Sequence, residues 1–187
     1  MKKFYIAFLL VSLVGIQACD DILPDVNTKL SKTFTITLTQ SNSGSSVEEI
    51  MDISAANEYN EFKNTVKGYE LEKITYKVTN SNVPNDMYFT GSIICKKQDG
   101  TQPLTAASIT KANIAAAADS TSEIDVTENM ADVATILGWL ESEGKFKVNS
   151  SFALTNAQNA PYTMTTAVIG KTFNLTLSFY IIVKTGV

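Results

Sequence analysis

The 187-residue sequence predicts a mainly β domain, an antiparallel sandwich of two sheets with about seven strands and two short crossover helices. Several segments alternate apolar and polar residues with a period of two, which is typical of strands that have one face in a core. Polar segments rich in Gly, Pro, Asn and Ser separate them. Only two segments show helical spacing. An α+β fold, with both helices on one face of an antiparallel sheet, is the alternative.

The strands are predicted where the alternation is sustained. Their expected bounds are 33–39, 47–53, 69–79, 87–97, 146–154 and 172–184. A helical turn is a second interpretation of 47–53, and in 102–119 the pattern does not decide between strands and an irregular crossing. The last strand is the most apolar, and Tyr180 and Ile182 make even its second face partly apolar, so we expect something to cover that face. Together the segments indicate an Ig-like sandwich.

Two helices are predicted from apolar residues spaced three or four positions apart. The first covers 55–66 with Ser54 as N-cap, and the second covers 127–144, from Thr127 as N-cap to Gly144 as the stop. The core-facing residues of the second helix are expected to be Met130, Val133, Ile136, Leu137 and Leu140.

Trp139 lies beside the apolar row of the second helix. We expect it to cover the margin of the core, as a single tryptophan at the edge of an apolar face usually does. The other interpretation is a stacking platform for a sugar ring, with Glu141 and Glu143 nearby. Those two acids are more simply a solvated face, because residues two apart point to different sides of a helix.

Segments 40–46 and 119–125 are predicted to be polar loops. The oxygens of 119–125 are closely spaced, as in a calcium-binding loop. However, Ile124 stands where that loop needs glycine, and Met130 where it needs a bidentate glutamate. We therefore expect no metal there, and the sequence indicates no cofactor.

A positive start, an apolar run and a cysteine make up the first nineteen residues. Met1–Lys3 carries the charge, Phe4–Val14 carries none, and Ile16-Gln17-Ala18-Cys19 follows. This last segment resembles the lipobox of bacterial lipoproteins, with Gln17 where Ser, Ala, Thr or Val is usual. The resemblance implies that a signal peptide, residues 1–18, is removed and that Cys19 is the lipid attachment site for acyl chains such as palmitate.

Two other interpretations fit this segment less well. Ordinary secretory cleavage needs small residues three positions and one position before the cut, and Ile16 is large. An uncleaved membrane span needs ~20 apolar residues, more than Phe4 to Ala18 supplies. The lipoprotein interpretation divides the chain into the signal peptide 1–18, a lipid-anchored tether 19–31 and a single β-rich domain 32–187.

The lipid anchor implies a location in the cell envelope. Asp20-Asp21, directly after the cysteine, resembles a surface-export signal of some Gram-negative groups, while an aspartate there resembles an inner-membrane retention signal of others. The two acids also suit a solvated tether. We expect the outer membrane, with exposure at the cell surface left open.

Charge and residue types restrict the function. The chain has 15 Lys and no Arg, 19 acidic residues and no His, so its formal charge is −4, and −6 without Lys2 and Lys3. The usual general base is therefore missing, as is the bidentate fork that recognises phosphate and guanine. We expect neither an enzyme nor a nucleic-acid binder. With Cys19 acylated, Cys95 has no disulfide partner and is expected in the core.

The sequence thus predicts a non-enzymatic, membrane-tethered envelope lipoprotein that serves as a binding or assembly module for a protein or a glycan; it does not indicate the ligand-binding residues. An adhesin or pilus-like subunit is one alternative, because the chain stops shortly after its most apolar strand, which would then pair with a neighbouring subunit. A carboxylate-based glycan hydrolase is another, and it requires a cleft with two acids within ~10 Å of each other.

Overall fold

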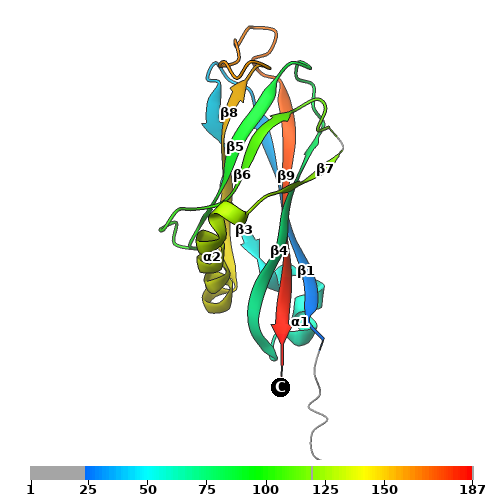
Figure 1. Cartoon of the computed structure of the whole chain (residues 1–187), viewed down its shortest axis with the longest axis vertical. Helices are drawn as coiled ribbons and strands as arrows, with labels where there is room; N and C mark the ends of the chain where they lie inside the picture. Colours follow the sequence, from blue (N-terminus) through cyan, green and yellow to red (C-terminus); the bar gives the residue numbers. More distant parts are fainter. Residues whose placement is uncertain (1–23, 119, 187) are drawn as a thin grey trace, which may run out of the picture.

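The computed structural model describes residues 24–118 and 120–186, which form an elongated sandwich of two antiparallel sheets (Figure 1). The prediction of a mainly β, two-sheet sandwich is confirmed, with nine strands in this described part. The strands are β1 (Val26–Thr37), β2 (Ser43–Ser45), β3 (Glu49–Asp52), β4 (Val66–Thr79), β5 (Tyr88–Lys96), β6 (Leu104–Asn113), β7 (Thr121–Ile124), β8 (Lys145–Thr155) and β9 (Thr172–Thr185). The helices are α1 (Asn57–Phe62) and α2 (Met130–Glu143), preceded by the 3₁₀ turns η1 (Ile53–Ala55) and η2 (Thr127–Asn129).

The strand order is that of a jelly roll. One sheet has the order β1-β9-β4-β7, and the other has β2-β8-β5-β6 with β3 also paired to β8. Because β2 and β3 pair with successive parts of β8, they act as one interrupted strand. All connections except β2–β3 and the β5–β6 hairpin then cross from one sheet to the other, an arrangement typical of jelly rolls and different from the strand order of immunoglobulin domains.

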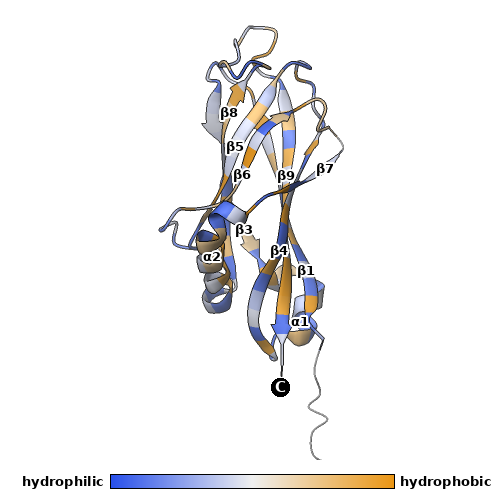
Figure 2. Ribbon diagram, in the orientation of Figure 1, coloured by the Kyte–Doolittle hydropathy of each residue, from blue (hydrophilic) through white to orange (hydrophobic). Residues whose placement is uncertain are grey.

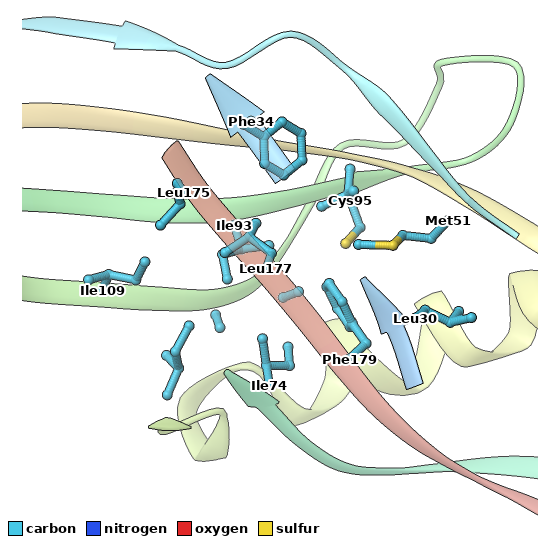
Figure 3. Packing of buried hydrophobic residues seen from close by; sticks show 14 of the residues in the cluster. Leu30, Phe34, Met51, Ile74, Ile93, Cys95, Ile109, Leu175, Leu177 and Phe179 are labelled. Atoms are coloured by element: carbon cyan, nitrogen blue, oxygen red, sulfur yellow. The ribbon is translucent and has the colours of Figure 1, made fainter. Parts of the chain in front are cut away.

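The core lies between the two sheets and is built from alternating residues of the long strands (Figure 3). Phe89, Phe146 and Phe173 are fully buried, and ring contacts join them to their neighbours, as in the edge-on pair Phe146 and Phe179 with centroids 5.4 Å apart. Hydrophobic residues occur on all the long strands (Figure 2). Cys95 is fully buried among them, so its expected place in the core is confirmed, and burial raises the pKa of its thiol.

The helices fill the lower half of the sandwich, the half that contains the C-terminus in Figure 1. There β1, β4 and β9 extend beyond the second sheet, and helices take its place against their inner face: α1 contacts β1, while α2 contacts β4, β6 and β8. Trp139 is consequently buried with Val133, Ile136 and Leu140, where the sequence predicted only the core margin. Met130, predicted in the core, is 54% exposed, and the buried row of α2 begins only at Val133.

The domain begins before the expected boundary at residue 32. Residues 26–31, predicted as tether, are the first half of β1 and pair with the end of β9 in unbroken register. Val26, Thr28 and Leu30 face inward there, but the next inward position is Lys32, which interrupts the apolar alternation in the sequence. The strand was therefore not recognisable from its pattern.

Two predicted loops contain short strands. Within 40–46, β2 pairs with β8, and within 119–125, β7 pairs with β4. Both are short edge strands with few apolar residues, so they owe their structure to a neighbouring strand and not to their own pattern.

The two helices differ from their predicted beginnings. The first is shorter than 55–66, because β4 already starts at Val66. Ser54 does not cap it, because Ala56 stands at the N-cap position and Ser54 lies in the turn η1, where its N–H donates to Asp52. Likewise Thr127 does not cap α2, because Asn129 stands at the N-cap position and Thr127 lies in η2, where its N–H donates to Asp125. Gly144 ends α2 as predicted, with φ of +71° and its N–H donating to Leu140.

Gly91 gives a test of the packing between strands. A Cβ at this position would lie 2.7 Å from the Phe89 ring and 2.8 Å from the backbone oxygen of Ser151, and a backbone atom cannot move aside cheaply. We expect Gly91→Ala to lower the free energy of unfolding by about 2 kcal/mol, measured by urea denaturation. As the matched control, Gly138→Ala in α2 meets nothing within 4 Å and should raise it by about 0.5–1 kcal/mol. Equal effects in the two variants would contradict this account.

Candidate binding site at an open side of the sandwich

Cys19, the one site residue that the sequence predicts, lies outside the described residues. The chain enters the described domain at the end that also holds its C-terminus (Figure 1). There Lys184 lies 2.9 Å from both Asp25 and Glu70, and the hydrogen bonds it donates lower the pKa of Asp25 and raise its own. These contacts fix the point from which any upstream segment leaves the domain.

A two-sheet sandwich has two open sides, where the edge strands of the sheets face each other without pairing. The first open side lies between β1 and the interrupted strand β2–β3, and the second lies between β7 and β6. The first open side contains two hollows, of about 320 Å³ and about 120 Å³. The second contains one of about 230 Å³.

The larger hollow of the first open side combines charge with apolar surface. Lys32 and Asp52 supply charged side chains, and Leu30 and Ile50 supply apolar surface. Lys32 lies 3.9 Å from Glu49 across the gap, so this lysine is weakly paired. The side chain of Lys29 points to the outer face of the sheet, where its ammonium group lies 5.4 Å from the ring centre of Tyr180. The lower end of this side therefore offers one lysine, Lys32, to an anionic group.

The smaller hollow of the first open side is uncharged. Hydroxyl groups from the end of β1, the following loop and β2 line it, and Phe152 forms its apolar part. Gly44 allows this approach, because a Cβ there would lie 3.2 Å from the Phe152 ring. The upper end thus offers hydroxyl groups beside an aromatic ring, in contrast to the lysine of the lower end.

Two large apolar side chains are exposed on the same side. Val47 is 75% exposed and Ile50 is 42% exposed, and together with Met130 they are the exposed large hydrophobic residues of the described chain. Val47 lies in the bulge between β2 and β3, next to Glu48. The carboxylate of Glu48 is 2.6 Å from the ammonium group of Lys96 and 3.2 Å from that of Lys147, so the bulge is held against the second sheet.

The hollow of the second open side is lined by two carboxylates, Glu123 and Asp125, at positions two apart in an extended segment, which places their backbones ~7 Å from each other. This meets the distance that the glycan hydrolase alternative requires. The N–H and hydroxyl of Thr127 donate to Asp125 and lower the pKa of its carboxyl group. A general acid needs a raised pKa, so Asp125 is not suited to that role.

The remaining predicted features are not binding sites. Trp139 is 5% exposed and offers no face for stacking on a sugar. The second face of β9 is covered in part by lysine side chains, since the ammonium groups of Lys29 and Lys73 lie 5.4 and 5.2 Å from the ring centre of Tyr180. The described residues contain no cluster of three or more His, Cys, Asp or Glu side chains that could hold a metal ion. Nor does any described helix have the length and apolar content needed to cross a membrane.

Comparison of the sequence with known protein families and with curated proteins finds no match. Among solved structures, a protein of Desmodium yellow mottle tymovirus is 9% identical with a TM-score of 0.34, covering 88% of this chain and 90% of that one. A protein of Macrobrachium rosenbergii nodavirus is 12% identical with a TM-score of 0.39, covering 92% and 56%. The decameric BFDV capsid protein is 11% identical with a TM-score of 0.38, covering 86% and 99%. These values are too low to indicate a shared task.

Sequence reasoning did not find the first open side, because it joins residues 29–39 to residues 43–56. Val47 and Ile50 were the available signals. Val47 and Ile50 are three positions apart, so in a strand they point to opposite faces and cannot both face one core.

The two ion pairs of Glu48 give a test of how the bulge is held. The hydrogen bond from Lys96, followed by that from Lys147, holds the pKa of the Glu48 carboxyl group below its usual 4.5. We expect Glu48→Gln to lower the free energy of unfolding by about 0.5–1 kcal/mol at pH 7. Because the folded-state pKa is lowered, this stabilisation is present above the unfolded-state pKa and is lost as the pH falls through the folded-state value.

The measurement is urea denaturation of both proteins at pH 7 and at successively lower pH, over which the difference should shrink. Glu49→Gln is the matched control, because Glu49 lies 3.9 Å from its lysine and is 44% exposed, so its effect should be under about 0.3 kcal/mol. A Glu48→Gln effect that persists at the lower pH would contradict the ion-pair account.

Proposed function

We propose that this chain is a lipid-anchored protein of the cell envelope that binds a protein or a glycan through the first open side of its sandwich. The observation that supports binding is the gathering of Val47, Ile50 and two hollows on that one side. Exposed apolar residues that cluster beside polar groups are typical of interaction surfaces. The lipobox-like segment that ends at Cys19 supports the anchor.

With an anchor at Cys19, the direction of β1 determines which end of the first open side lies nearer the membrane. Cys19 precedes Asp25 by six positions, so the tether reaches at most ~20 Å. From there β1 runs for 12 residues along the domain, or ~40 Å. With an anchor at Cys19, the lysine of the lower hollow would lie nearer the membrane and the hydroxyl-lined hollow farther from it.

The argument for the adhesin or pilus-like alternative does not apply to this strand arrangement. It rested on an apolar last strand that would pair with a neighbouring subunit. In the structure β9 already pairs with β1 on one side and with β4 on the other, over nearly its full length. A neighbouring subunit could pair only with an edge strand.

The anchor is tested by comparing the natural protein with Cys19→Ala in the cells that produce it. We expect the natural protein to have the intact mass of a chain that starts at Cys19 and carries at least two acyl chains, because one chain holds a protein at a membrane only marginally. Cys19→Ala should lack this mass and leave the membrane fraction. Protease treatment of intact cells then distinguishes surface exposure from a location inside the envelope. A natural protein without acyl chains would overturn the anchor.

A further inference from the structure

The first strand is the longest regular edge of the sandwich. β1 has 12 residues, pairs with no other strand of the described chain than β9 and shows no register shift along that pairing. The other edge strands are protected against pairing: β2, β3 and β7 have three or four residues each, and β6 has two register shifts against β5. Short or bulged edges discourage the addition of another strand, whereas a long regular edge invites it.

The hydrogen bonds of Leu38 show which backbone groups of β1 are free. Its N–H donates to Lys171 and its carbonyl accepts from Gly170, both at 2.8 Å, so Leu38 bonds towards the β9 side. Hydrogen-bonding positions alternate along an antiparallel strand. The even-numbered residues of β1 therefore bond to β9, and Ser31, Thr33 and Thr35 direct their N–H and C=O groups to the open edge. Among the described strands β1 pairs with β9 alone, so no other strand occupies these groups.

The side chains around this edge change along its length. From Thr33 to Thr37 the strand carries no charge, so nothing electrostatic opposes a further strand there. At the lower end Lys32, which points inward, is only weakly paired with Glu49. Ile50 lies across the gap, where it lines the larger hollow. The edge thus offers unpaired backbone groups, apolar contact with Ile50 and a positive charge at Lys32.

We propose that an extended segment of a partner protein adds to β1 as a further strand over Ser31–Thr37. Its apolar side chains face Ile50, and an acidic side chain at one end faces Lys32. Main-chain hydrogen bonds supply much of the affinity in this mode of recognition, and side-chain contacts supply the specificity. The proposal rests on the proposed binding function and names the class of partner.

A second copy of this chain does not suit the same edge. In an antiparallel pairing of β1 with another β1, the two strands run in opposite directions, so the second domain is inverted. Its chain would then leave at the opposite end of the pair, and with the strands upright on the membrane two anchors at Cys19 could not both reach it through tethers of ~20 Å. A free extended segment has no such restriction.

A glycan does not match the edge either. The free backbone groups recur at every second residue, ~7 Å apart, with an N–H and a C=O at each position. A peptide backbone reproduces this spacing of donors and acceptors, whereas sugar hydroxyl groups have no such repeat.

The experiment uses the purified full-length chain in mild detergent and a phage-displayed library of random nine-residue linear peptides as the probe. Peptides that are enriched are synthesised and their affinities measured for the natural protein, Thr35→Pro and Thr35→Val. Proline removes only an outward N–H, so the pairing with β9 is retained. Both variants lose the bond from the Thr35 hydroxyl to Asn174, which makes Thr35→Val the matched control. Thermal unfolding verifies that all three proteins are folded.

We expect Thr35→Pro to weaken binding by about tenfold or more and Thr35→Val to change it by less than about twofold. N-methylation of alternate backbone amides in the peptide should abolish binding in one of the two possible frames. Enriched peptides should also carry an acidic residue at one end, and Lys32→Ala should weaken these.

Three results would overturn the proposal: a library without enriched peptides, enriched peptides that bind all variants equally, or a dimer of the natural protein that Thr35→Pro dissociates. A glycan array probed in parallel distinguishes a failure of the proposed strand partner from a failure of the proposed binding function. A glycan that binds the natural protein and Thr35→Pro equally, with no peptide enriched, would remove the strand partner and leave the proposed binding function standing. Acylation of Cys19 is measured independently of all these outcomes.

Discussion

The pairing of β9 with β1 and β4 is the interaction on which the rest of the structure depends. The last strand lies between the first and the fourth, and its inward residues from Phe173 to Val183 are almost completely buried. Val26 pairs with Val183, so the sheet closes only when the two ends of the described chain meet. The entropy cost of such distant contacts must be met before the contacts stabilise anything. The first strand therefore cannot acquire its only partner until the last strand is in place.

The central place of β9 determines which groups are left unpaired. Since β9 is occupied on both sides, the free positions of its sheet are the outer edges of β1 and β7 and the part of β4 that β7 does not reach. Only four residues of β7 pair with β4, and α2 packs against β4 as well. The opposite edge has a full-length strand, and α1 contacts it only near the lower end, where the helix covers the inner face. The asymmetry between the two open sides thus follows from the strand order and from where the helices lie.

The fold class was predictable because alternation depends on each strand's own residues, but strand partners were not. The period of two in 69–79, 146–154 and 172–184 is present in the structure as β4, β8 and β9. β2, with the sequence Ser-Gly-Ser, has no apolar residue, and only its contact with β8 makes it a strand. The burial of Trp139 was also not predictable, because it depends on the second sheet being shorter than the first, which leaves inner surface for α2 to cover.

Lys32 connects the failure of prediction with the candidate site. It stands at an inward position of β1, where a lysine inside a closed core would carry a high desolvation cost. Here the position opens onto the gap between the sheets, and the ammonium group lies 3.9 Å from Glu49 with the side chain 39% exposed. The residue that interrupted the apolar pattern, and so placed the expected domain boundary at 32, is therefore tolerated because β1 is an edge strand. An inward-pointing charge is also one of the devices that keep sheet edges from unspecific pairing. At this edge the charge of Lys32 protects only the lower end of β1 against pairing, because Thr33–Thr37 carry no charge. The same lysine would determine the register of an added strand, since an acidic side chain of that strand would pair with it.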